Sequence, residues 1–291
     1  MQIAYHIGAH ATDDDRLIKS LLKNKQMLQS HGVAVPGPSR YRQQIRETLA
    51  SAANETPTHE TAETLFRSIV QEDHVSRVIL SGEHFICIPD RVFAQQKFYA
   101  LADKRLPLLA QLAPSNEVEI HIATCNPAIF IPTVFAASNA KDFATFMQNT
   151  DPVDLHWSEL TARMKSLVPG AKLVVWANED TPVLWPRLLQ SLSGLSQAKI
   201  FDGSLDMIHD VITPEGKNRL EAYLKSHPPK SHTQFQKILT AFLEKFEKED
   251  STQIEIDLPG WTDDLIDTLT TNYEWDLDRI QGMEGVTFIT P

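Results

Sequence analysis

The fold is decided by the stretch Tyr5-His-Ile-Gly-Ala-His-Ala-Thr-Asp-Asp-Asp15 and by Arg16-Leu-Ile-Lys-Ser-Leu-Leu22, which follows it. The pattern predicts a short apolar strand, a tight turn at Gly8 and the first turns of an amphipathic helix. Many proteins bind a phosphate with this layout, because backbone N–H groups and the positive end of the helix point at the anion. Here the turn carries three aspartates and has no lysine or arginine before Arg16. The layout predicts an anion site, whereas the side chains oppose one.

This turn resembles the opening of the sulfotransferase-like P-loop proteins of bacteria. In that family a strand ending in His-Ile-Gly-Ala-His precedes a basic residue and a sequence such as Thr-Gly-Thr-Thr. The loop there holds the 5′-phosphosulfate of 3′-phosphoadenosine 5′-phosphosulfate, the sulfate donor. Residues 5–10 and Thr12 match the pattern, but Ala11 stands at the basic position. Asp13–Asp15 replace the glycine and the two hydroxyl residues. The resemblance therefore implies a donor loop that has lost its cation.

A second stretch carries the same resemblance, Glu117-Val-Glu-Ile-His-Ile-Ala-Thr124 followed by Cys125-Asn-Pro127. The family usually has Arg-Asn-Pro at this position, and the arginine binds the 3′-phosphate together with a hydroxyl residue further on. Here Cys125 stands at the arginine position and Thr133 at the hydroxyl spacing. Both phosphate ends of the donor have thus lost a cationic ligand. The resemblance assigns a degenerate donor site to Gly8, Ala9, His10, Ala11, Thr12, Asp13, Asp14, Asp15, Cys125 and Thr133.

Further segments fit the resemblance in order and spacing, so it spans nearly the whole chain. They are Ile79-Leu-Ser-Gly-Glu-His-Phe85, Asp151-Pro-Val-Asp-Leu-His-Trp-Ser-Glu-Leu160, Leu173-Val-Val-Trp-Ala-Asn-Glu-Asp-Thr-Pro182 and Asp257-Leu-Pro-Gly-Trp-Thr262. The resemblance implies a three-layer α/β fold of P-loop type. It does not establish an activity, which depends on the residues of the site.

Apolar runs and helical periodicity alternate along the chain, which predicts a mostly parallel sheet covered on both faces. Because the pattern is helical beyond Ser204, we expect a single domain over 1–291, with an α/β core over 1–204 and a helical C-terminal extension over 205–291 packed on it. Strands are expected at Ile3–Ile7, Val78–Leu80, Val118–Thr124 and Lys172–Trp176, with a short strand or extended tail at Val286–Ile289. Helices are expected over Asp15–His31, Ile45–Ala53, Thr61–Glu72, Ala94–Leu112 with an interruption near Pro107, Ile129–Asn139, Lys141–Gln148, Trp157–Leu167, Leu184–Leu192, Pro214–Lys225, Thr233–Phe246 and Asp263–Ile280, with a loop over Gly32–Arg42.

The aspartates and histidines of the turn have more than one interpretation. Asp13–Asp15 directly precede the helix, so their carboxylates can cap its free N–H groups and complement its dipole. Alternatively they hold a metal ion or a cationic ligand. His6 and His10 flank the turn, where a metal site with the aspartates competes with a role in packing the loop through hydrogen bonds. We expect the helix cap, the packing role and no metal.

Glu83 and His84 follow the strand Val78–Leu80 at its carboxyl end, where α/β sheets place their ligands. In a working sulfotransferase a glutamate or histidine removes the proton of the acceptor hydroxyl, so these two residues are the catalytic candidates. The alternative is that they are polar residues of an exposed loop. Cys87 and Cys125 lie beside strand ends without a C-x-x-C motif, and we expect both to be buried and unreactive.

Length and composition are those of a soluble globular protein. The chain has 291 residues, of which 42% are hydrophobic and 22% charged, and this is enough for one large core. It contains no apolar run as long as a membrane span. The N-terminal residues do not look like a secretory signal. We therefore expect a cytoplasmic protein that does not bind a membrane.

The negative charge is concentrated near the C-terminus. The formal net charge is −11, and residues 249–278 contain ten carboxylates but no lysine or arginine, so the remainder carries about −1. Such an acidic block repels nucleic acid and anionic lipid, which argues against a nucleic-acid partner. We expect a solvated helix face here, and the alternative is an acidic docking surface for a basic partner.

Three functions are compatible with the sequence. The favoured one is a sulfotransferase-like protein that lacks sulfate transfer and acts as a binding or interaction protein, without a cofactor and with an unidentified small molecule or protein as partner. The second is an active sulfotransferase that uses 3′-phosphoadenosine 5′-phosphosulfate through an altered loop. The third is a metal-dependent enzyme that uses the Asp13–Asp15 cluster.

Overall fold

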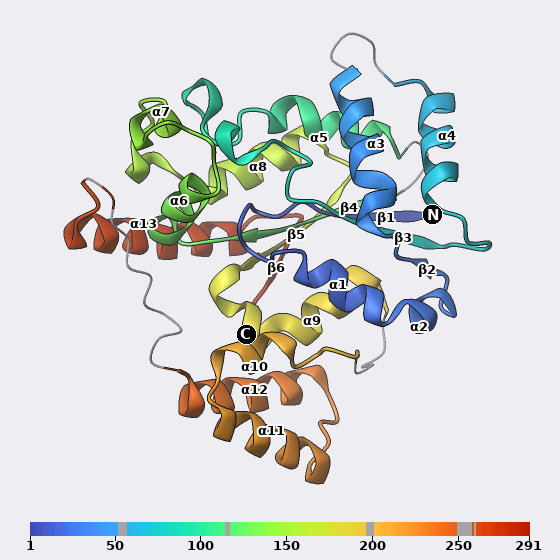
Figure 1. The fold of residues 1–291 in the computed structure, drawn as a ribbon, viewed down its shortest axis with the longest axis vertical. Coiled ribbons are helices and arrows are strands. Elements are labelled where there is room, and N and C mark those ends of the chain that lie inside the picture. Colours follow the sequence, from blue (N-terminus) through green and yellow to red (C-terminus); the bar gives the residue numbers. More distant parts are fainter. Residues whose placement is uncertain (52–56, 114–116, 196–200, 249–257, 259) are drawn as a thin grey trace.

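The computed structural model describes residues 1–51, 57–113, 117–195, 201–248, 258 and 260–291. Its centre is a sheet of six parallel strands in the order β2-β3-β1-β4-β5-β6 (Figure 1). This confirms the expected α/β fold with a parallel sheet, and the residues 286–289 form a strand rather than an extended tail. The strands are β1 (Gln2–His6), β2 (Val33–Ala34), β3 (Arg77–Ser81), β4 (Glu117–Thr124), β5 (Lys172–Ala177) and β6 (Val286–Ile289).

Helices cover both faces of the sheet because the strands are apolar on both sides. In β1, Ile3 and Tyr5 are buried in one apolar cluster, whereas Ala4 between them is buried in the other. This alternation is typical of parallel strands that lie between two helical layers. The upper layer of Figure 1 contains α3 (Pro38–Ser51), α4 (His59–Ile69), α5 (Ala102–Gln111), α6 (Pro127–Ala136), α7 (Phe143–Met147), α8 (Trp157–Leu167) and α13 (Asp263–Gln281). The lower layer contains α1 (Arg16–Lys23), α2 (Lys25–Gln29), α9 (Thr181–Ser193), α10 (Asp206–Val211), α11 (Pro214–Ser226) and α12 (His232–Phe246).

The residues after Ser204 are divided between the two faces of the sheet. Helices α10, α11 and α12 lie below α9 in Figure 1, and Ile208, Leu220 and Leu239 bury their side chains in the same cluster as α9. Helix α13 lies on the opposite face against α6 and α8, and the chain then enters β6 at the edge of the sheet. This part of the chain is largely helical, but its last strand completes the sheet.

Two elements expected from periodicity differ in the structure. The expected loop over Gly32–Arg42 contains β2, and α3 begins within it at Pro38. The expected long helix over Asp15–His31 is divided at Asn24 into α1 and α2. The Asn24 side-chain amide donates to the carbonyls of Ser20, at 2.8 Å, and Asp202, at 2.9 Å. These bonds tie the end of α1 to a distant segment, which periodicity does not reveal.

The expected helix over Ala94–Leu112 is also wrong in its first half. The structure has a single 3-10 turn at Ala94–Gln96, and α5 begins at Ala102 and continues through Pro107. The intervening residue Tyr99 has a positive φ of 50°, which is incompatible with a right-handed helix. Its buried ring instead packs beneath the turn that follows β1, so a tertiary contact overrides the helical pattern.

The order of the strands brings several loops together at one edge of the sheet. Because all strands are parallel, the carboxyl ends of β1, β3, β4 and β5 lie along one side of the sheet, which we call the carboxyl edge. The opposite side, where the strands begin, is the amino edge. Strand β1 lies between β3 and β4, so the chain crosses over β1 as it passes from β3 to β4. Open α/β sheets bind their ligands at such a switch point. None of the helices in the described ranges is both long enough and apolar enough to span a bilayer.

Candidate functional site

The turn after β1 is tight and lies against the loop after β3. Gly8 has a φ of 105°, and a Cβ atom there would come within 3.3 Å of the Glu83 Cβ. Ala11, Asp14 and Asp15 also have positive φ values, of 55°, 46° and 64°. Residues other than glycine rarely adopt this left-handed geometry. The turn is therefore held in its shape by the contacts around it.

Two backbone N–H groups of this turn are bonded to side chains of the same chain. The N–H of Ala11 donates to Glu83 Oε2 at 3.0 Å. The N–H of His10 donates to the Tyr99 hydroxyl at 3.2 Å. A carboxylate of the protein thus binds a loop N–H group of the kind that phosphate-binding turns offer to an anion.

The three aspartates of the turn have different surroundings. Asp13 Oδ2 accepts a hydrogen bond from the N–H of Leu17 at 3.1 Å, which confirms the expected cap on α1. Asp15 instead accepts two hydrogen bonds from the guanidinium of Arg42 on α3, one of them 2.9 Å long. The bonds from Arg42 hold the pKa of the Asp15 carboxyl below its usual range. Asp14 is exposed. Asp13 therefore caps the helix, whereas Asp15 ties the turn to α3.

The carboxylate of Glu179 binds a backbone N–H group after β4, as that of Glu83 binds one after β1. The N–H of Asn126 donates to Glu179 Oε1 at 2.7 Å, and the Tyr273 hydroxyl donates to Glu179 Oε2 at 3.0 Å. Cys125 is buried, and burial followed by the nearby Glu179 raises the pKa of its thiol. Thr133 donates its hydroxyl to the carbonyl of Ile129 on its own helix, at 2.7 Å. At the ends of both β1 and β4, a glutamate side chain of the protein therefore binds a backbone N–H group.

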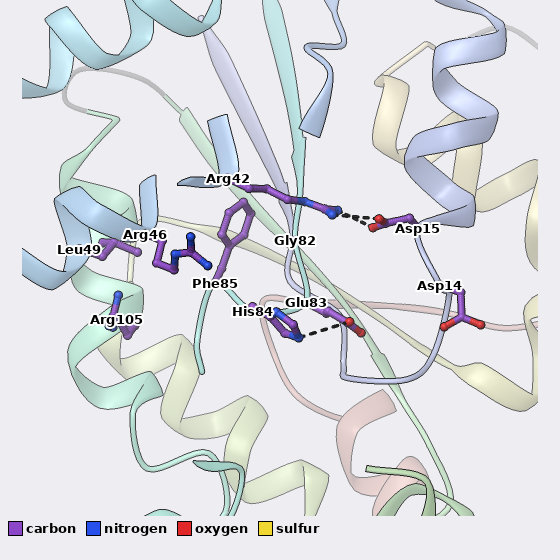
Figure 2. Close-up of a pocket in the computed structure, with 10 residues that line it drawn as sticks. All are labelled: Asp14, Asp15, Arg42, Arg46, Leu49, Gly82, Glu83, His84, Phe85 and Arg105. Atoms are coloured by element: carbon purple, nitrogen blue, oxygen red, sulfur yellow. Dashed lines mark hydrogen bonds and ion pairs between the residues drawn. The ribbon is translucent and has the colours of Figure 1, made fainter. Parts of the chain in front are cut away.

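Glu83 and His84 line a cavity of about 360 Å³ between α3 and the loops after β1 and β3 (Figure 2). Their side chains lie close together, with Glu83 Oε1 3.4 Å from His84 Nε2. Two of the expected loop residues, Asp14 and Asp15, line the same cavity. The sequence did not identify its other lining residues, which are Arg42, Arg46, Leu49, Gly82, Phe85 and Arg105.

The histidines beside the turn are buried and hydrogen-bonded. His10 Nδ1 lies 2.6 Å from the Tyr99 hydroxyl, and its Nε2 lies 2.8 Å from the carbonyl oxygen of Cys87. Burial lowers the pKa of His10 to about 4, so its ring is neutral at pH 7. His6 Nδ1 lies 2.9 Å from Ser81 Oγ, and burial lowers the pKa of His6 as well. These contacts confirm the packing role that we expected for both residues.

Metal ligands do not come together in this region. Within the described ranges, no group of three or more His, Cys, Asp or Glu side chains is arranged to hold a metal ion. Asp13 and Asp15 are engaged by Leu17 and Arg42 instead. Cys87 is buried, and burial raises the pKa of its thiol to about 12, so it is not poised as a thiolate ligand. The donor set therefore does not favour the metal-dependent alternative.

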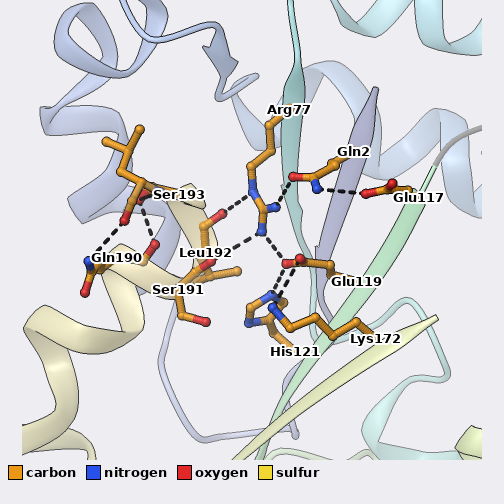
Figure 3. Close-up of polar contacts among 11 residues, drawn as sticks. Gln2, Arg77, Glu117, Glu119, His121, Lys172, Gln190, Ser191, Leu192 and Ser193 are labelled. Atoms are coloured by element: carbon orange, nitrogen blue, oxygen red, sulfur yellow. Dashed lines mark hydrogen bonds and ion pairs between the residues drawn. The ribbon is translucent and has the colours of Figure 1, made fainter. Parts of the chain in front are cut away.

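A separate ionic network lies at the opposite, amino edge of the sheet (Figure 3). The Arg77 guanidinium donates to Gln2 Oε1 and to the Leu192 carbonyl, both at 2.8 Å, and to the Glu119 carboxylate. Glu119 also contacts His121 Nε2 at 3.3 Å and Lys172 Nζ at 3.4 Å. Against the opposing effect of burial, hydrogen bonds from His121 and Arg77 hold the pKa of Glu119 well below its usual range. Arg77, Glu119 and His121 are buried, and Lys172 reaches Glu119 from the surface, so the network acts as a structural element.

The acidic block near the C-terminus is only partly a solvated face. Residues 249–257 lie outside the described ranges, whereas 263–278 belong to α13. Asp276 on this helix is buried, at 2% exposure, and accepts hydrogen bonds from the N–H of Ser158, at 2.9 Å, and from its hydroxyl. It therefore caps the first turn of α8, a role that the charge pattern did not indicate. The other carboxylates of this helix are exposed, namely Asp263, Asp264, Asp267, Glu274 and Asp278.

Comparisons with known proteins add no family or function. No protein-family model, no curated protein and no solved structure matches the chain. The function of this chain is therefore to be inferred from the residues at the carboxyl edge.

Proposed function

We propose that this chain is a small-molecule binding protein on a sulfotransferase-like fold, and that it does not transfer sulfate. One observation carries the proposal. The N–H groups of Ala11 and Asn126, at the ends of β1 and β4, donate to Glu83 and Glu179. The resemblance to sulfotransferases implies that the donor nucleotide would place its phosphates at the ends of these two strands. Neither Ala11 nor Cys125 supplies a cation there.

The residues at these two ends do not fit 3′-phosphoadenosine 5′-phosphosulfate. A phosphate oxygen about 5 Å from a fixed carboxylate is opposed by roughly 3 kcal/mol at an effective dielectric near 20. This repulsion corresponds to about two decades of affinity at each end. A donor molecule would also have to replace the hydrogen bonds that Glu83 and Glu179 already make. The carboxylates therefore act as internal substitutes for the ligand phosphates.

Titration calorimetry with 3′-phosphoadenosine 5′-phosphosulfate tests this proposal. We expect the wild-type chain to show no saturable heat at ligand concentrations up to about 1 mM. The variant Glu83→Gln/Glu179→Gln removes both charges with little change in shape, and we expect weak but measurable binding. The control Glu117→Gln removes one carboxylate charge at the amino edge and should behave as wild type. Micromolar binding by the wild-type chain contradicts the proposal.

A second candidate, a group-transfer enzyme, is favoured by one contact. Glu83 and His84 lie 3.4 Å apart on the wall of the cavity, as a base and its partner would. Against this role, Glu83 Oε2 is already bonded to the N–H of Ala11. Turnover of the sulfate donor with a panel of phenolic acceptors separates the two functions. Turnover that disappears in His84→Ala supports the enzyme, whereas the binding protein gives none with either chain.

A further inference from the structure

Three arginines from different parts of the sequence line adjoining cavities beside His84. Arg46 comes from α3 and Arg105 from α5, and both line the cavity of about 360 Å³ (Figure 2). Both also line a neighbouring cavity of about 140 Å³, which Arg91 joins from the short turn Pro89–Arg91. His84 borders both cavities. The two cavities thus share one wall of basic side chains.

These arginines have no acidic partner among the residues that the structure describes. No ion pair or side-chain hydrogen bond involves Arg46, Arg91 or Arg105 in that part of the chain, although Arg42 on α3 is paired with Asp15. Burial, and then the charge of Arg91, lower the pKa of Arg105. Cations close to each other and without a counter-charge create a local positive potential that attracts anions.

Apolar side chains also line both cavities. Leu49 and Phe85 line the larger cavity, and Ile86 and Leu101 line the smaller one. Ile88 at the smaller cavity is 45% exposed, which is unusual for a large aliphatic side chain in this protein. Ligand pockets commonly combine such apolar walls with a few polar groups that fix the orientation of the ligand.

We infer that these cavities bind a small molecule with an anionic head group and an apolar body, and that Arg46, Arg91 and Arg105 hold the head group. The inference rests on the proposed binding function and specifies the chemistry of its ligand. Guanidinium groups suit a carboxylate, sulfate or phosphate because they donate two parallel hydrogen bonds to such an anion. Three carboxylates also line the larger cavity. Asp15 is paired with Arg42, and Glu83 accepts a hydrogen bond from the N–H of Ala11. Asp14 lies beside Asp15, on the side of the cavity away from Arg46 and Arg105 (Figure 2).

Calorimetry with four probes tests the inference on the full chain. Phenyl phosphate and phenylacetate carry an anionic head on an apolar ring. Benzyl alcohol carries the ring with a neutral hydroxyl group, and inorganic phosphate carries the head alone. We expect at least one of the two ring-bearing anions to bind more tightly than benzyl alcohol and inorganic phosphate. We also expect its affinity to fall when salt is raised to about 0.3 M. If benzyl alcohol bound as tightly as the ring-bearing anions, the proposed preference for an anionic head group would be wrong.

Substitutions locate the binding. Arg46→Gln and Arg105→Gln should each lower the affinity for the ring-bearing anion by about 10-fold or more, which is typical of a hydrogen bond between charged groups. Arg40→Gln is the matched control, because Arg40 lies on the same helix α3 but lines neither cavity. It should change the affinity by less than about twofold. Thermal unfolding of each variant verifies that it is folded.

Two further results would overturn the inference. One is the absence of binding by either ring-bearing anion at concentrations up to about 10 mM. The other is binding that survives in Arg46→Gln/Arg105→Gln. Neither result bears on the titration with the sulfate donor, which tests Glu83 and Glu179. A failure of this inference is therefore distinguishable from a failure of the proposed function.

Discussion

The two edges of the sheet use charge in opposite ways. At the amino edge Arg77, Glu119 and His121 form a buried network that the exposed Lys172 joins, and each group has a partner (Figure 3). At the carboxyl edge the pair of Asp15 and Arg42 is half-exposed, and three further arginines border open cavities. A closed network stabilises the fold, whereas charges without a partner beside a cavity are available to a ligand. A functional site is therefore expected at the carboxyl edge.

The largest expected effect comes from opening the closed network. Glu119→Ala leaves Arg77 buried without its carboxylate, and breaking a buried pair in this way typically costs about 3–5 kcal/mol of unfolding free energy. Urea denaturation measures the loss. Glu117→Ala, an exposed carboxylate two residues earlier in β4, is the control and should cost less than about 0.5 kcal/mol. A loss below about 1 kcal/mol for Glu119→Ala would contradict the structural role of the network.

A pH titration of stability probes the buried histidine of the carboxyl edge. The pKa of His10 is about 4 in the folded chain and near 6.5 when unfolded, so the unfolded chain binds the additional proton between these values. The unfolding free energy should therefore fall as the pH decreases from about 6.5 to 4, by up to about 1.4 kcal/mol per pH unit from this residue alone.

His10→Phe removes this titration, and its unfolding free energy should depend less steeply on pH over the same range. The exposed His227 gives a control substitution, His227→Phe, which should leave the slope as in the wild-type chain. Urea midpoints measured across the pH range determine both slopes. An unchanged slope in His10→Phe would show that the ring is already protonated in the folded chain.

A smaller effect is expected from breaking the ion pair at the carboxyl edge. The side chains of Arg42 and Asp15 are 33% and 37% exposed, and ion pairs of this kind contribute about 0.2–1 kcal/mol. Arg42→Gln should therefore lower the unfolding free energy by at most about 1 kcal/mol. The pair of Arg219 and Glu215 on α11 is more exposed, at 59% and 63%, and offers the control Arg219→Gln, with a smaller effect. If Arg42→Gln cost as much as Glu119→Ala, the contrast between the two edges would not hold.

The main elements of the fold could be predicted from sequence because each strand is an apolar run between amphipathic helices. Strand β2 was missed since Val33–Ala34 is too short to show any periodicity. The first half of the expected helix over Ala94–Leu112 was wrong because Tyr99 turns inward to His10, a contact between residues far apart in the sequence. The sequence pattern around Tyr99 contains no information about this contact.

The candidate site was predictable only where it follows a strand directly. Glu83 and His84 were identified by their position after β3, and both line the cavity. The arginines were missed because Arg46, Arg91 and Arg105 lie on separate elements that only the fold brings together. The role of Glu179 was missed for the same reason, since it bonds to the N–H of Asn126 across the ends of β4 and β5.

The amide resonances of Ala11 and Asn126 show whether Glu83 and Glu179 exclude the donor phosphates from the ends of β1 and β4. A chain labelled with ¹⁵N at alanine and asparagine reports on the two N–H groups that Glu83 and Glu179 bind. We predict that 3′-phosphoadenosine 5′-phosphosulfate leaves both resonances in place at concentrations up to about 1 mM, and that Glu83→Gln shifts the resonance of Ala11. Saturable shifts of both resonances in the wild-type chain on addition of the donor would contradict the account.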